Sequence, residues 1–183
     1  MAVFDESFPR TWQVDVLPNQ PLIAPARAFV YPHDAEEADS GALQLLIHPA
    51  RGSAFLATCA LGFADSSVPT GIWTSPNPDQ ICAVAGGYAY LIQTLDPGTF
   101  EQIEFRPVLL VQALPEHNLL LFGGHHSLLA YGPQGRAWHS PRLSWEGIEI
   151  NEISGNILRG TGWDLMTDSN VEFAVDLRTG EKI

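Results

Sequence analysis

The stretch Leu119-Leu-Leu-Phe-Gly-Gly-His-His-Ser-Leu-Leu-Ala-Tyr131 decides the fold class, because an apolar run turns at a glycine pair and returns as a second apolar run. Two short apolar runs joined by glycine are typical of an antiparallel hairpin. The pattern recurs upstream and downstream, and the glycines at its turns, Gly87, Gly124 and Gly162, are about 37 and 38 residues apart. The sequence therefore predicts an all-β fold built from antiparallel meander hairpins.

Further strand signals lie on both sides of this stretch. Residues 147–153 and 156–162 flank a turn at Ser154-Gly155-Asn156 and are predicted to pair as a hairpin. Residues 107–113 and 119–123 are almost entirely apolar, which is typical of central strands covered on both faces. No segment combines a 3.6-residue apolar period with helix caps, so little helix is expected. The remaining strand candidates are 11–17, 43–48, 54–63, 71–74, 81–85, 88–94, 101–105, 126–131, 136–139, 171–177 and 181–183.

The chain length of 183 residues suits a single domain, and one all-β domain over 1–183 is predicted. Within it, residues 1–80 are less regular and residues 81–183 are repeat-like. Prolines at 18, 21, 25 and 32 predict edge or connector segments in the first part, since proline cannot donate to a β-ladder. The polar stretch 33–41, rich in carboxylates, is predicted to be a solvated loop.

Charge excludes several classes of partner. Nine Lys and Arg stand against 21 Asp and Glu, for a net charge of −12, and the basic residues are scattered. Nucleic acid is therefore not an expected partner, because it is held by clustered cations, and neither is an anionic membrane. No apolar run is long enough to span a bilayer, and no signal peptide is apparent. Two cysteines, Cys59 and Cys82, lie in apolar runs as buried hydrophobic residues, and together these features favour the cytoplasm.

Two dipeptides give the chain a resemblance to a known family. Gly124-His125 is followed by Trp163-Asp164 at the separation typical of WD-type β-propeller blades, and the repeat spacing is similar. The resemblance implies a propeller-like architecture that is open or incomplete, since three such units are fewer than a closed propeller needs. A β-sandwich with repeat-like hairpins is the alternative. About the last forty residues, which include Gly162-Trp-Asp and Val175-Asp-Leu-Arg-Thr-Gly-Glu, resemble uncharacterised bacterial proteins, which implies no activity.

Aromatic residues near turns are the first candidates for a site. Tyr131, Trp138 and Trp163 are predicted to lie at turns or strand ends, with Arg136 as a nearby donor for a carboxylate. Tryptophan and tyrosine in such places bind sugars, peptides or proteins. The alternative interpretation is that the same rings pack in the core and at turns. Other aromatic and arginine residues of the repeat region belong to the same group, namely Trp73, Tyr88, Tyr90, Trp145, Arg142 and Arg159.

Histidines supply the second candidate. His117, His126 and His139 are predicted to lie at neighbouring strand ends and, if the meander brings them to one rim, could bind a metal ion together with Asp or Glu. No His-x-His spacing fixes that geometry in advance, so isolated histidines at turns are the alternative. No nucleophile elbow, phosphate loop or dinucleotide motif is present.

These observations lead to a non-enzymatic ligand-binding or protein-binding β module, with an unidentified protein or small molecule as its partner and no cofactor. The alternative is a metal-assisted hydrolase or isomerase that uses the three histidines. A third hypothesis is a structural protein whose exposed strand edges pair with copies of itself, which would make it a homo-oligomer.

Overall fold

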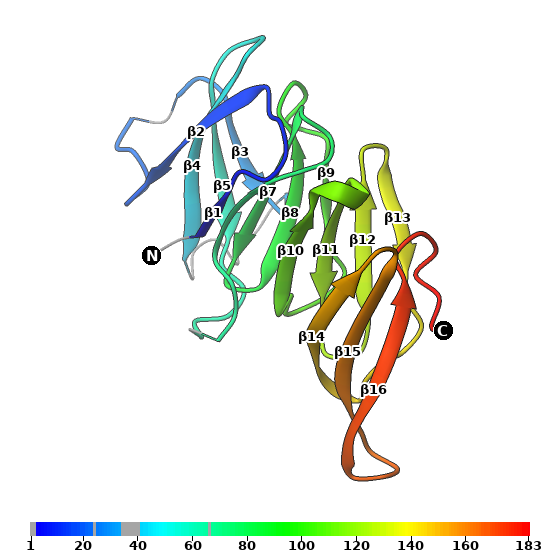
Figure 1. The fold of residues 1–183 in the computed structure, drawn as a ribbon. Helices are drawn as coiled ribbons and strands as arrows, with labels where there is room; N and C mark the ends of the chain where they lie inside the picture. The colour runs from blue at the N-terminus through cyan, green and yellow to red at the C-terminus, as the bar shows by residue number, and fades with distance from the viewer. Residues whose placement is uncertain (1–2, 24, 34–40, 66) are drawn as a thin grey trace. The chain divides into compact units, whose positions relative to one another are not determined.

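A computed structural model describes residues 3–23, 25–33, 41–65 and 67–183. The chain divides into two compact units, Met1–Val108 and Leu109–Ile183, each built from two β-sheets (Figure 1). The division falls after Val108 and not near residue 80, because the strands just after residue 80 belong to the same sheet as Gly71–Thr74. The described residues contain no helix long and apolar enough to cross a membrane.

The first sheet of unit 1 has the order β2-β4-β5-β3. Its strands β4 and β5, which match the strand candidates 43–48 and 54–63, form an antiparallel hairpin with Leu45 opposite Ala57. Strand β3 runs parallel to β5 at the edge of the sheet, in the proline-rich part that was predicted to be edge or connector. The strand bounds are β2 (Trp12–Leu17), β3 (Ala28–Tyr31), β4 (Ala42–Pro49) and β5 (Phe55–Ala60).

The second sheet of unit 1 has the order β1-β6-β7-β8-β9. Strands β7 and β8 form a tight hairpin at Gly86-Gly87, where both glycines have positive φ. Backbone in that region favours glycine, so the Gly-Gly pair explains why the chain turns here. The strand bounds are β1 (Val3–Asp5), β6 (Gly71–Thr74), β7 (Gln80–Ala85), β8 (Tyr88–Gln93) and β9 (Phe100–Gln102).

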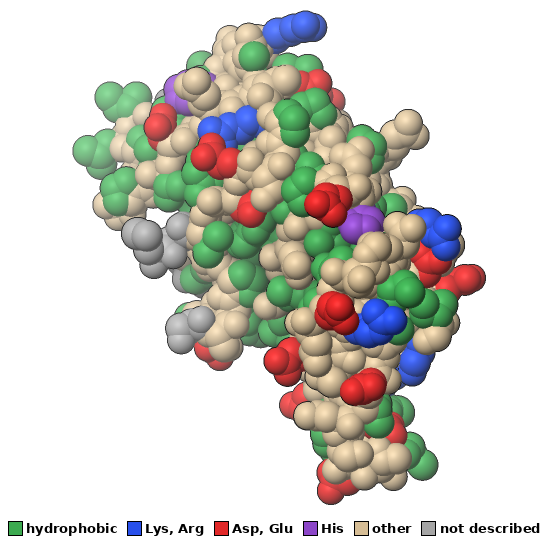
Figure 2. All heavy atoms as spheres, in the orientation of Figure 1, with side chains coloured by type: hydrophobic (Ala, Val, Ile, Leu, Met, Phe, Trp, Pro, Cys, Tyr) green, Lys and Arg blue, Asp and Glu red, His purple; other side chains and the backbone are tan. Residues whose placement is uncertain are grey.

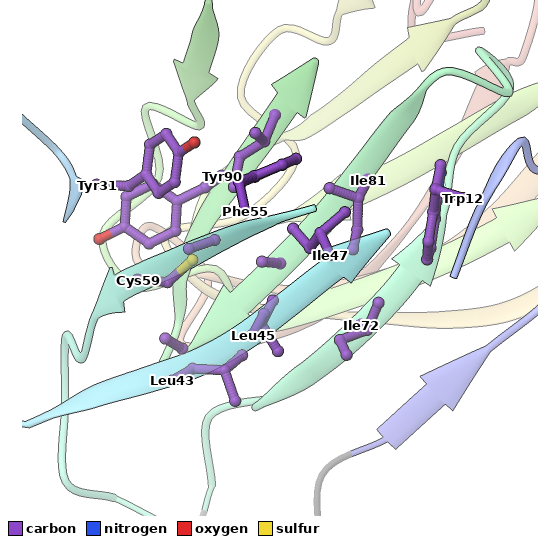
Figure 3. Packing of buried hydrophobic residues seen from close by; sticks show 14 residues of the cluster. Trp12, Tyr31, Leu43, Leu45, Ile47, Phe55, Cys59, Ile72, Ile81 and Tyr90 are labelled. Carbon is purple, nitrogen blue, oxygen red and sulfur yellow. The ribbon is translucent and has the colours of Figure 1, made fainter. Parts of the chain in front are cut away.

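The core of unit 1 lies between these two sheets (Figure 3). Leu45 and Ile47 of β4 and Ile81 of β7 are fully buried there, following the two-residue period of strands. Each such aliphatic side chain stabilises the fold by about 1.5–3 kcal/mol relative to an exposed one. Buried tyrosine hydroxyls are satisfied by backbone: Tyr31 donates to the Pro97 carbonyl at 2.8 Å and Tyr90 to the Ala60 carbonyl at 3.0 Å.

Unit 2 contains two antiparallel meanders, with orders β10-β11-β12-β13 and β14-β15-β16. The buried side chains of Leu121, Leu158 and Val175 belong to one core cluster that both sheets share. A short 3₁₀ helix, η2 (Pro115–His117), joins β10 to β11. The strand bounds are β10 (Leu110–Leu114), β11 (Leu119–Gly123), β12 (Leu128–Gly132), β13 (Gly135–His139), β14 (Glu146–Ser154), β15 (Ile157–Asp164) and β16 (Ser169–Asp176).

The predicted fold class is confirmed: the chain is all-β and mainly antiparallel, none of the four sheets closes on itself, and the described residues contain no α-helix. The hairpin through Ser154-Gly155-Asn156 is present as β14 and β15.

The prediction of a central strand at 107–113 is wrong, because β10 is an edge strand with half-buried side chains. Most of the predicted acidic loop, residues 34–40, lies outside the described residues. The WD-type propeller resemblance stays a prediction.

Candidate functional site

Two of the predicted ligand-binding aromatics lie inside unit 2. Trp138 is only 6% exposed, belongs to the core cluster, and its indole N–H donates to the Leu177 carbonyl at 2.6 Å. Tyr131 is also buried and meets Phe122 edge to face, with 5.8 Å between ring centroids. Their burial assigns both rings to packing and not to a ligand surface, because strands β12 and β13 direct them inward.

The other two predicted residues reach the surface but are not brought together. Arg136 is exposed on β13, next to the β12–β13 turn, and Trp163 is half-buried on β15, next to the β15–β16 turn. These two turns lie at opposite ends of unit 2 (Figure 1). The predicted group of Tyr131, Trp138, Trp163 and Arg136 therefore does not form a single surface.

The three histidines are also separated. His117 lies in η2 before β11, whereas His126 follows the end of β11, so the length of that strand lies between them. His117 Nε2 is 2.7 Å from the Gly155 carbonyl oxygen, and His139 Nε2 is 2.9 Å from Ser127 Oγ. Across the described residues, no group of three or more His, Cys, Asp or Glu side chains could hold a metal ion. The expected convergence of His117, His126 and His139 is thus not found, because η2 and the β11–β12 turn occupy opposite ends of one strand.

Both cysteines are fully buried and free. Burial raises the pKa of the Cys59 thiol and of the Cys82 thiol well above their ordinary value. A thiol in that state is a poor nucleophile, since the thiolate is the reactive form. The structure gives these side chains a packing role.

A surface at the start of β14 and the end of β15 brings together Arg142, Trp145 and Trp163, which were sequence candidates but were not predicted to form a group of their own. The guanidinium carbon of Arg142 lies 4.3 Å from the ring centroid of Trp145, and Trp145 is 41% exposed. The backbone N–H of Trp145 donates to the backbone carbonyl of Trp163 at 2.8 Å, so the two residues lie side by side across this hydrogen bond. An arginine over a tryptophan face is attractive by about 0.5–1 kcal/mol at exposed sites and fixes both side chains.

The two residues between Arg142 and Trp145 anchor the loop that carries them. Leu143 and Ser144 are buried, and their N–H groups donate to the His126 carbonyl at 2.7 and 3.2 Å. The Ser144 hydroxyl donates to the Trp163 carbonyl at 3.2 Å. The loop therefore presents its exposed ring on a rigid backbone, which lowers the entropy lost on binding.

Gly162 explains how this loop comes so close to β15. A Cβ at position 162 would lie 2.6 Å from Ser144 Cβ and 3.0 Å from the Leu143 carbonyl oxygen. Real Cβ atoms do not approach neighbours so closely, so only glycine leaves room for the loop here. The glycine of the repeat pattern thus has a positioning role in the structure.

The β15–β16 turn adds exposed apolar side chains next to Trp163. Leu165 is exposed and Met166 is 83% exposed, while the Asp164 carboxylate accepts from the Thr167 hydroxyl at 2.9 Å and shapes the turn. Figure 2 shows hydrophobic side chains beside carboxylates at the free end of this hairpin. We call Arg142, Trp145, Trp163, Leu165 and Met166 together the Trp145 rim.

Arg142 and Trp145 were both candidates from the sequence, but the stacking of one on the other was not predicted. Arg142 and Trp145 are three residues apart in a loop opened by Pro141, with an apolar residue between them. Their stacking depends on which side chains the loop buries, and this follows from the close approach to Gly162. Comparison of the sequence with protein-family models and with curated proteins found no match.

Proposed function

We propose that this chain is a non-enzymatic protein-binding β module and that the Trp145 rim is its binding surface. The observation that carries the proposal is the exposed Trp145 ring, stacked against Arg142 at 4.3 Å, while Leu143 and Ser144 between them are buried. Tryptophan and arginine are the residues most enriched among those that dominate protein interfaces.

The partner's chemistry follows from the rim. Leu165 and Met166 expose apolar surface to water, and binding that removes this surface from water is favourable. Methionine adapts to differently shaped neighbours, so it suits a partner surface. The Arg142 guanidinium, fixed on one face by Trp145, keeps donors for a carboxylate. The partner is therefore a protein segment that offers an apolar side chain beside Asp or Glu.

Selection of a random-peptide display library against the full chain tests this function. Enriched peptides should combine an apolar residue with a neighbouring carboxylate. Their affinity should fall by about tenfold or more in Trp145→Ala and in Arg142→Gln, since residues central to an interface cost about 1.4 kcal/mol or more when truncated.

Arg136→Gln is the matched control, because it removes an exposed arginine at the other end of unit 2 and should leave affinity unchanged. Enriched peptides that bind Trp145→Ala as tightly as the unaltered chain would refute the proposal, and so would a library that yields no enriched peptide. Peptides that copy a segment of this chain would instead identify a second copy as the partner and would also overturn it.

A further inference from the structure

Unit 1 contains two adjoining hollows that the proposed function does not use. One has a volume of about 410 Å³, and the other of about 230 Å³. They share Thr11 and Ala50, whose backbones are joined by a 2.6 Å hydrogen bond from the Ala50 N–H to the Thr11 carbonyl. The walls are therefore fixed by the pairing of β2 with β4, and the larger volume lies in the range of small-molecule sites.

Basic side chains line these hollows in a chain that has few of them. Arg10 and His48 line the larger hollow and Arg51 lines the smaller one. Figure 2 shows basic and histidine side chains close to carboxylates over the ends of β2 and β4. Two of the nine Lys and Arg residues thus face one small region.

Arg10 is held rigidly, and one of its nitrogens has no hydrogen-bond partner. Its guanidinium carbon lies 4.9 Å from the Phe4 ring centroid and 5.2 Å from that of Trp12, and its Nη2 is 2.5 Å from a Glu6 carboxylate oxygen. Its Nη1 is buried and without a partner within the described residues. A buried donor left unpaired costs about 1–3 kcal/mol, more for a charged group, and points to a ligand, an ion or a water that completes it.

We infer that these hollows bind a small organic anion, whose carboxylate or phosphate accepts hydrogen bonds from the Arg10 guanidinium. Planar guanidinium donors match both groups, and the stacked rings fix their direction in advance. Arg10 itself lines the larger hollow, and Phe4, which stacks on its guanidinium, is 46% exposed on the short edge strand β1. His48 also lines the larger hollow, with its Nε2 3.1 Å from the Asp15 carboxylate.

The smaller hollow defines the rest of the ligand. Asp79 and the apolar side chain of Leu95 line that hollow. The Asp79 carboxylate accepts a hydrogen bond from the Thr11 hydroxyl and can accept further ones. A ligand that spans both hollows would therefore place a hydroxyl or ammonium group near Asp79. This gives a short hydroxy acid, amino acid or hydroxyl-bearing phosphate ester as the ligand class.

Two-dimensional NMR titration of the full chain tests the inference with two probes, L-malate and glycerol 3-phosphate, and with sodium chloride at equal ionic strength as the control. At least one probe should give saturable shifts at the amides of Thr11, Gln13 and Ala50. The probe that binds tighter distinguishes a carboxylate ligand from a phosphate ligand. In Arg10→Gln its affinity should fall by about tenfold or more, because a charge-assisted pair is lost.

Arg159→Gln is the matched control, since it removes an arginine from the surface of unit 2, and its affinity should equal that of the unaltered chain. If Arg10→Gln does not fold, Arg10→Lys keeps the charge but loses the two-pronged geometry and should still weaken binding severalfold. Shifts that do not saturate, that appear equally with chloride, or that persist unchanged in Arg10→Gln or Arg10→Lys would overturn the inference. In those cases water alone completes Nη1.

Discussion

Replacing Trp138 by alanine should destabilise unit 2 severely, because this ring is part of its core. The side chain is 6% exposed, its N–H donates to the Leu177 carbonyl at 2.6 Å, and Gly180 lies so close that an added Cβ would be 2.6 Å from the ring. Removal of a buried tryptophan leaves a cavity and costs about 3–5 kcal/mol. The expected loss for Trp138→Ala is therefore about 4 kcal/mol.

Trp138→Phe separates packing from hydrogen bonding. It keeps most of the apolar ring but leaves the Leu177 carbonyl without its indole donor, so it should cost about 1–3 kcal/mol. Trp145→Ala, at 41% exposure, should cost no more than about half as much as Trp138→Ala, because part of that ring never leaves water on folding.

Urea denaturation of the full chain, followed by circular dichroism, measures these differences. Amide hydrogen exchange of β15 and β16 reports on unit 2 separately, and protection there should fall by several hundredfold in Trp138→Ala, the equivalent of about 4 kcal/mol. A loss below about 1 kcal/mol in Trp138→Ala, or a greater loss in Trp145→Ala, would refute the assignment of Trp138 to the core and Trp145 to the surface.

Three further predictions concern packing, thiols and acid. Gly162→Ala would place a Cβ 2.6 Å from Ser144 Cβ and should cost about 1–3 kcal/mol, shown by a lower melting temperature, whereas an unchanged melting temperature would contradict the close approach. Cys59 and Cys82, buried with raised pKa values, should resist a thiol reagent at pH 8 in the folded chain and react in denaturant; labelling of the folded chain at the rate of a free thiol would show that they are accessible. The Asp176 carboxylate accepts hydrogen bonds from the side chain and the backbone N–H of Arg178, which lower the pKa of its carboxyl from 3.8 to about 2. Its contribution to stability is therefore present above pH 4 and is lost as the pH falls toward 2. The free energy of unfolding measured against pH should show this loss of stability in the unaltered chain and not in Asp176→Asn. Identical pH profiles in the two chains would exclude a contribution of the Asp176 carboxylate to stability.

Local patterns in the sequence predicted much of the fold. The strand at 119–123 begins and ends where the apolar run does, and β11 is buried along its whole length between β10 and β12. In the strand candidate 171–177, the alternation of apolar residues with carboxylates places Phe173 and Val175 in the core. Strands are specified by such short-range periods, which is why these predictions needed no knowledge of the partner strands.

Features that depend on distant partners were not predictable in the same way. The parallel edge strands β1 and β3 are paired with strands far along the chain, and nothing in their own residues indicates this. An apolar run such as 110–114 has the same composition in an edge strand as in a central one, so the position of β10 was missed.

The candidate site depended on side-chain direction, which composition does not fix. Trp138 and Trp145 both follow short polar segments, yet one donates to a buried carbonyl and the other lies on the surface under Arg142. What distinguishes them is the close approach of residues 143 and 144 to Gly162. This contact joins segments that are distant in the sequence, so local patterns do not predict it.

The most direct measurement of the central claim is the NMR footprint of a peptide selected from the library on the full chain. The account predicts that the indole N–H of Trp145 and the amides of Arg142, Trp163, Leu165 and Met166 shift together and saturate at the same peptide concentration. A footprint that leaves Trp145 unchanged and falls on other parts of the surface would contradict it.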